Sequence, residues 1–157
     1  MPDDLYDRDI LAWSQAQAER LRRLAAGERV NDLDWTNVIE EIEEVGRSQL
    51  LAVESLLLQA LVHAMKAAGW PDQQAVRHWT GEIVAFLVQA RRRYAPSMAQ
   101  ALDLDSIHAD ALRIVHRADI PGEPLALTQA PPLTLQELLD PDLAPETLIA
   151  RLREDAA

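Results

Sequence analysis

The feature that most constrains this chain is a central stretch, from Ser48 to Ala68, that is apolar on most sides of a helix. Its large apolar residues are Leu50, Leu51, Val53, Leu56, Leu57, Leu58, Leu61, Val62 and Met65. A helix that is apolar nearly all round is buried, so this one is predicted to form the centre of a helical bundle. Its polar interruptions, Glu54, Gln59, His63 and Lys66, argue against a membrane span.

Two amphipathic segments precede this stretch. The first is predicted to be a helix from about Leu5 to Ala26, capped by Asp3 or Asp4 and followed by Gly27 in a left-handed conformation. Its inward stripe is expected to contain Ile10, Trp13, Leu21 and Leu24, with Gln17 as a polar gap.

The second segment begins after Asp34, a good helix cap, and its expected inward residues are Trp35, Val38, Ile42 and Val45. This helix either ends at Gly46 or continues into the central stretch. One helical glycine costs only about 1 kcal/mol, so both alternatives stay open.

The second half of the chain is also helical in pattern. A helix from Pro71 to Tyr94 is expected to bury Val76, Trp79, Ile83, Phe86, Ala90 and Tyr94. A helix capped by Asp105 or Ser106 is expected to reach Ala118 and to bury Ile107, Ala111, Ile114 and Val115. After a proline-rich segment, Thr134 and Glu137 form a capping box, and Pro145 begins a last helix that ends at Arg153.

These patterns predict an all-α fold, a helical bundle of about four main helices plus one or two short C-terminal helices. We expect a single domain over residues 1–157, with the main bundle in 1–119 and the proline-rich segment and short helices of 120–157 packed on it. A chain of this length needs no disulfide to fold, and it contains no cysteine.

The charge and the missing motifs narrow the classes of function. A formal net charge of −11 argues against nucleic acid as a partner. The first ten residues lack a secretory signal, so we expect a cytoplasmic protein without a membrane partner. The sequence has no nucleophile elbow, P-loop or dinucleotide-binding glycine pattern, and no cofactor is predicted.

The densest cluster of charged residues is Glu40, Glu41, Glu43 and Glu44. Helical spacing places Glu41 and Glu44 on one face, where carboxylates could contribute to a metal site inside a bundle. The alternative is a solvated acidic helix start with ordinary ion pairs such as Glu43 with Arg47.

His63 and Lys66 lie on the otherwise apolar central helix, where charge is costly unless it is paired. With His78 and the two acids they could form a polar or metal-binding site, although no HExxH or di-iron pattern is present. The alternative is a structural hydrogen bond or ion pair inside the bundle. His108 and His116 are expected at the surface or its boundary.

Several short segments stand out in order along the chain: Asp9–Trp13 (DILAW), Leu33–Asn37 (LDWTN), Val38–Glu43 (VIEEIE), Gly46–Ser48 (GRS), His63–Lys66 (HAMK), Trp79 with Ile83, and Leu135–Asp140 (LQELLD). Together they resemble a bacterial family, domain-of-unknown-function family 29. Ala64 and Met65 differ from the family's usual leucines, and its usual tyrosine near the fifth helix is replaced by Ile107 or a neighbour. The resemblance implies an all-α fold and transfers no activity.

The favoured function is a non-catalytic protein-interaction or regulatory module, because the scaffold is acidic and helical and has no catalytic motif. A homodimer is plausible, since the chain has four tryptophans and tryptophan is enriched at interfaces. The alternative is a metal-dependent or polar-pocket enzyme built on Glu41, Glu44, His63 and His78. A third option is a small-ligand binder around Trp70, Trp79 and His63.

Overall fold

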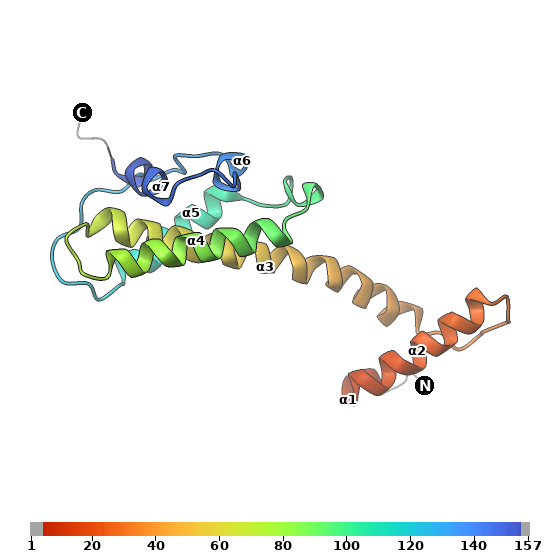
Figure 1. Cartoon of the computed structure of the whole chain (residues 1–157). Coiled ribbons are helices and arrows are strands. Elements are labelled where there is room, and N and C mark those ends of the chain that lie inside the picture. The colour runs from red at the N-terminus through yellow and green to blue at the C-terminus, as the bar shows by residue number, and fades with distance from the viewer. Residues whose placement is uncertain (1–4, 155–157) are drawn as a thin grey trace. The chain divides into compact units, whose positions relative to one another are not determined.

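The computed structural model describes residues 5–154, and within them the regular structure is helical (Figure 1). The helices are α1 (Leu5–Arg8), α2 (Ile10–Ala25), α3 (Trp35–Gly69), α4 (Val76–Arg93), the 3-10 helix η1 (Pro96–Met98), α5 (Leu104–His116), α6 (Leu135–Leu138) and α7 (Pro145–Leu152). The described residues form no β-strand and only one isolated bridge, between Leu127 and Arg153. The predicted all-α class is confirmed.

The contacts divide the chain into two compact units, residues 1–48 (unit 1) and residues 49–157 (unit 2). The boundary falls inside α3, so this helix supplies residues to both units. The expectation of a single domain over the whole chain stays a prediction.

In unit 1, the expected first helix is interrupted at Asp9. The Asp9 carboxylate accepts a hydrogen bond from the Ala12 amide at 3.0 Å and caps α2, so the chain starts a new helix there. The caps expected at Asp3 or Asp4 lie outside the described residues. Gly27 has a φ of +86° just after α2, which confirms its left-handed role.

α3 continues through Gly46 as one α-helix, which settles the alternative left open by the sequence. Its first turns differ from expectation in what they bury. Val38 is only 6% exposed, but Trp35, Ile42 and Val45 are 53%, 68% and 64% exposed. Their prediction as core residues was wrong. Periodicity shows that one face of a helix is apolar, but not whether another element covers that face.

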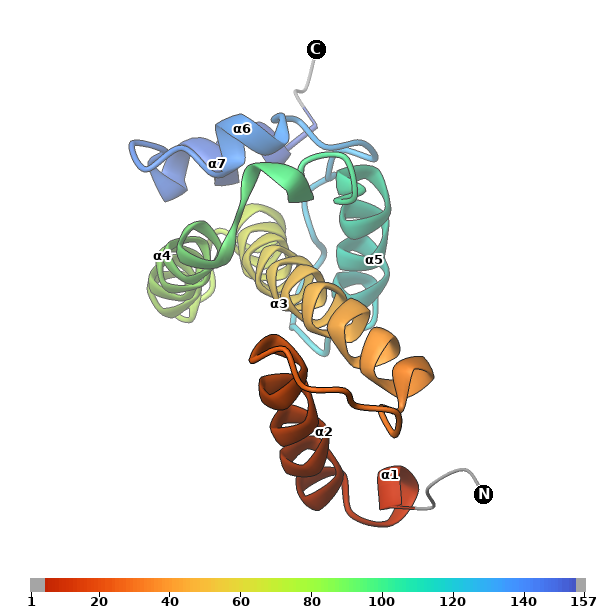
Figure 2. The ribbon, with the colours of Figure 1, turned by 90° about the vertical axis from the view of Figure 1, so that its right-hand side faces the viewer.

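Unit 2 contains the hydrophobic core, and the second half of α3 lies within it. Val53, Leu57, Leu61 and Met65 are at most 2% exposed. Figure 2 shows α4 and α5 on opposite sides of this part of α3. α3 is long and apolar enough to cross a membrane by length and composition alone, but half of its most apolar window is buried in the protein. The central position predicted for this stretch is confirmed.

Two helices of unit 2 begin at other residues than expected. Residues 71–75 form turns and α4 starts only at Val76. Asp103, rather than Asp105 or Ser106, caps α5 by accepting a hydrogen bond from the Ser106 amide at 3.1 Å. Their buried faces are shifted too: Leu87 and Leu112 are buried, whereas Ile114 is 46% exposed.

The C-terminal part of unit 2 is joined to the end of α3 by hydrogen bonds to backbone carbonyls. The Leu125 amide donates to the Gly69 carbonyl at 2.8 Å, and the Arg153 guanidinium donates to the Ala68 carbonyl at 3.1 Å. The capping box at the start of α6 is present, with both bonds between Thr134 and Glu137. The proline-rich segment and the short helices therefore pack on the helices of unit 2.

Candidate functional site

The two candidate acids of unit 1 have separate partners. The Tyr6 hydroxyl donates a hydrogen bond of 2.6 Å to Glu41, whereas Glu44 pairs with Arg47 one turn further along α3. The hydrogen bond to Glu41 is the main reason that the pKa of Tyr6 is raised to about 12, because it stabilises the neutral phenol. Each acid therefore makes a contact within unit 1 that is typical of a structural role.

The three candidate residues of unit 2 also have ordinary surroundings. His63 is half-buried, its Nδ1 lies 2.7 Å from the Gln59 carbonyl, and its ring packs on Phe86 at 5.4 Å between centroids. Lys66 is half-buried and His78 is exposed on α4. Among residues 5–154, no group of three or more histidine, aspartate or glutamate side chains is placed to hold a metal ion.

His108, expected at the surface or its boundary, is instead fully buried in α5, whereas His116 is exposed as expected. The His108 ring lies 2.8 Å, through Nε2, from the carbonyl of Thr128. A histidine donating one hydrogen bond to a backbone carbonyl satisfies part of its polar character inside a core. This contact joins α5 to the segment that follows the prolines.

The polar centre of unit 1 is a network around Asp34, made of Trp13, Gln17, Asp34 and Asn37. The Asp34 carboxylate accepts hydrogen bonds from the Trp13 indole at 3.0 Å and from the Asn37 side chain at 2.7 Å. The Gln17 side-chain oxygen accepts the Asp34 amide at 2.9 Å. The bonds to its carboxylate, the one from the Asn37 side chain most strongly, lower the pKa of Asp34, because they favour the charged form.

The Asp34 network gives its residues roles that the sequence pattern does not indicate. Gln17 was expected to be a polar gap in an apolar stripe, but it is 3% exposed and fixes the start of α3. Trp13 packs edge-on against Tyr6, with 4.9 Å between ring centroids. The sequence did not identify Gln17 and Asn37 as hydrogen-bond partners of Asp34, or Tyr6 as the partner of Glu41. A polar residue in the middle of an apolar helical face was the signal for Gln17, since a buried amide needs a hydrogen-bond partner.

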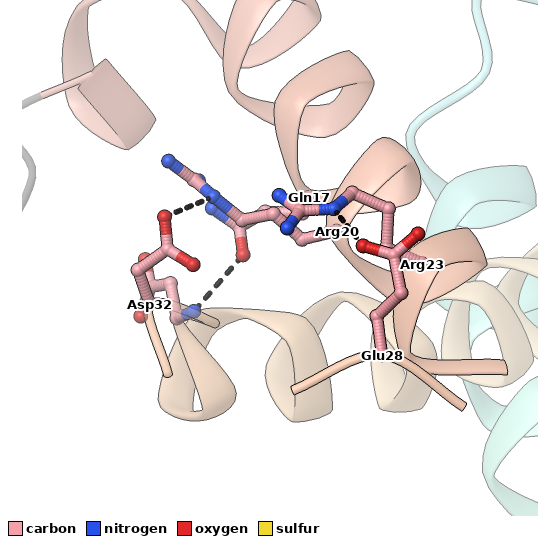
Figure 3. Close-up of polar contacts among 6 residues, drawn as sticks. Gln17, Arg20, Arg23, Glu28 and Asp32 are labelled. Carbon is pink, nitrogen blue, oxygen red and sulfur yellow. Dashed lines mark hydrogen bonds and ion pairs between the residues drawn. The ribbon is translucent and has the colours of Figure 1, made fainter. Parts of the chain in front are cut away.

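The loop between α2 and α3 is tied to α2 by ion pairs (Figure 3). The Arg20 guanidinium lies 2.8 Å from Asp32, and the Arg23 guanidinium lies 2.8 Å from Glu28. These pairs are partly or largely exposed, and exposed ion pairs contribute about 0–1 kcal/mol each. They orient the loop more than they stabilise the unit.

Unit 1 leaves a row of apolar side chains on α3 exposed to water. This apolar row consists of Trp35, Ile39, Ile42 and Val45. These side chains repeat every three or four residues and are 52–68% exposed. On α2, Ile10 and Leu24 are 50% and 39% exposed, although helical spacing puts them on the same face as the buried Trp13. Large exposed apolar patches are uncommon on soluble proteins that act as monomers.

The comparisons with known proteins agree with an all-α fold. The family model of the domain of unknown function DUF29 matches residues 5–144. A crystal structure at 1.45 Å resolution of an α-helical protein of unknown function from Rhodospirillum rubrum ATCC 11170 is similar, with a TM-score of 0.73 and 30% identity. That similarity covers 95% of this chain and 98% of the other. No curated protein matches the sequence.

Proposed function

The chain belongs to the family DUF29, whose description names no activity, and we propose from its geometry that it is a non-catalytic protein-interaction module. The apolar row of unit 1 is its docking surface. The observation that supports this proposal is the exposure of four large apolar side chains, at 52–68%, on one side of a single helix.

The contrast with the rest of unit 1 strengthens the proposal. The described part of this unit buries only Trp13, Gln17 and Val38. A unit of this size, residues 1–48, rarely has a core large enough for independent stability, and small folds often rely on oligomerisation, a metal or disulfides. The chain has no cysteine, and the described residues offer no metal cluster. A protein partner that covers the apolar row would supply the missing burial.

A photo-crosslinking residue tests this surface. We would place p-benzoylphenylalanine at Ile42, which is 68% exposed on the row, and at Ile114, which is 46% exposed on α5, as a matched control. The expected result in cells is one discrete protein adduct from position 42, absent from position 114. A diffuse smear, or the same adducts from both positions, would show that the row does not dock a specific protein.

A further inference from the structure

We infer that the partner of the apolar row is a second copy of this chain, paired about a two-fold axis through unit 1. The inference rests on the proposed function, because it names the occupant of the same surface. In unit 1, α2 and the first turns of α3 form a helical hairpin. Two such hairpins that meet by their apolar faces form a four-helix bundle. In such an isologous interface, each patch of one copy contacts the complementary patch of the other.

The exposed apolar area matches the need of a dimer. A standard interface buries about 800 Å² per partner, of which a little over half is apolar. The apolar row together with Ile10 and Leu24 provides six large side chains that are 39–68% exposed. Trp35 is the one aromatic residue among the six; with about 150–250 Å² for its whole side chain and less for each aliphatic one, the exposed portions together present on the order of a few hundred Å² of apolar surface. Burying this area against an identical patch would complete a bundle core.

Unit 1 carries a positive and a negative segment, so the surfaces of two copies can be electrostatically complementary. Residues 19–32 contain four arginines and three acids, two of which pair with Arg20 and Arg22, and carry a formal charge of +1, whereas residues 40–47 contain four glutamates and one arginine, a formal charge of −3. Their oppositely charged segments would face each other in a two-fold arrangement that sets one hairpin antiparallel to its copy. Complementary potentials of this kind fix the register of an interface and suppress wrong partners.

The hydrogen bonds of unit 1 place these two segments at opposite ends. Asp34 contacts Trp13 and Gln17 in the middle of α2, and Glu41 contacts Tyr6 in α1. α3 therefore runs back toward α1, which brings the negative segment to the α1 end of the unit. The positive segment occupies the last turns of α2 and the loop after it.

A copy of the same chain also satisfies the stability requirement better than a different protein. The described part of unit 1 buries few side chains, so it gains stability from any partner that is present as soon as the chain is made. Another copy is always present in this way, and association with it stabilises unit 1 by mass action.

The first test measures the mass of the purified full chain by light scattering. We expect a dimer of twice 17.6 kDa, and a monomer for Ile42→Asp, with a dissociation constant raised at least about a hundredfold. Ile114→Asp, at an isoleucine of α5 that is 46% exposed, should stay dimeric. A monomeric parent chain, or a dimer that tolerates Ile42→Asp, overturns the inference. Circular dichroism of each variant separates dissociation from unfolding.

A second test uses charge, because Ile42→Asp could simply unfold the hairpin. Glu40 and Glu43 are exposed acids of the negative segment. If they face arginines of the second copy, the double change Glu40→Gln and Glu43→Gln weakens the dimer about threefold to tenfold, and added salt removes that difference. A dimer that tightens instead has like charges facing, which overturns the two-fold arrangement.

The photo-crosslinker at Ile42 separates this inference from the proposed function. An adduct of twice the chain mass whose peptides come only from this sequence supports the second copy. A discrete adduct with a different protein overturns the homodimer and leaves the interaction module standing. No discrete adduct from position 42 overturns both.

Discussion

Unit 1 and unit 2 contain stretches of one helix, α3, but they bury it very differently. In unit 2, α3 contributes to a continuous core in which Val53, Leu57 and Met65 are completely buried. In unit 1, the same helix buries only Val38 and leaves Trp35, Ile39, Ile42 and Val45 in water. Both stretches are apolar at helical spacing. The difference teaches that apolar patterning specifies a face to be covered, whereas the fold decides whether the chain itself covers it.

The two units also use different forces. Hydrophobic burial stabilises unit 2, at about 25 cal/mol per Å² of apolar surface removed from water. Unit 1 relies on the Asp34 network and its caps, and a net hydrogen bond contributes only about 0.5–1.5 kcal/mol. Substitutions in the two units should therefore change the free energy of unfolding by different amounts.

The largest effect is expected for Leu57→Ala in the core of unit 2. Leu57 is completely buried, so the change removes apolar contacts and leaves a cavity, which costs about 2–5 kcal/mol of unfolding free energy. Leu51→Ala, on the same helix but 52% exposed, is the matched control and should cost less than about 1 kcal/mol. Urea denaturation measures both, and equal losses would contradict the burial described for α3.

A smaller effect, confined to unit 1, is expected for Trp13→Phe. The change removes the indole donor to Asp34 and leaves a partly buried carboxylate with one partner fewer, which costs about 1–3 kcal/mol. Hydrogen exchange should become faster in α2, while the amides around Leu57 keep their protection. Trp79→Phe on α4 is the control and should leave α2 unchanged. Uniformly faster exchange in both units would show that they unfold together.

Two glycines should respond in opposite directions. Gly46 is helical and an added Cβ would meet nothing within 4 Å, so Gly46→Ala is expected to stabilise the chain by about 0.5–1 kcal/mol. Gly27 also has open space, but its φ is +86°, and Gly27→Ala should destabilise by about 1–2 kcal/mol. Thermal unfolding compares the variants. A loss of stability in Gly46→Ala would mean that α3 is not helical there.

At acid pH, unit 1 should unfold before unit 2. The pKa of Asp34 is lowered below its ordinary value of 3.8, so its contribution to stability is complete above pH 3.8 and is lost as the pH falls through the folded pKa. The pKa of Asp103, the cap of α5 in unit 2, is also lowered, but α5 keeps its apolar contacts with the core when Asp103 is protonated. Asp34→Asn should flatten the acid transition of unit 1. Simultaneous loss of both units below pH 3.8 would contradict the comparison.

The smallest and most local effect is spectroscopic. Tyr6, with a pKa raised to about 12 by Glu41, should still be protonated at pH 11, whereas an unperturbed tyrosine with a pKa of 10 is mostly ionised. The raised pKa means that this stabilisation is complete below pH 10 and is lost as the pH rises toward 12. Ultraviolet titration follows it. Glu41→Gln should lower the pKa toward 10, and Glu44→Gln, the control, should not.

Local signals were read correctly from the sequence where the interaction was itself local. Asp34 caps α3, Thr134 and Glu137 form the capping box, and Gly27 adopts positive φ, because each of these depends on residues a few positions apart. The cap at Asp9 was missed, since an apolar stripe on both sides of it concealed the start of a new helix. The burial of His108 was missed because its partner, Thr128, lies beyond the proline-rich segment.

The sequence by itself determined an all-α chain with a buried central helix, since a stretch that is apolar on most sides allows few alternatives in water. Only the tertiary structure decided which amphipathic faces are covered. It buried Gln17 beside Asp34 and left the apolar row in water, because the covering of a face depends on which elements are long enough and near enough to reach it. That information lies in the distances between helices rather than in the spacing along any one of them.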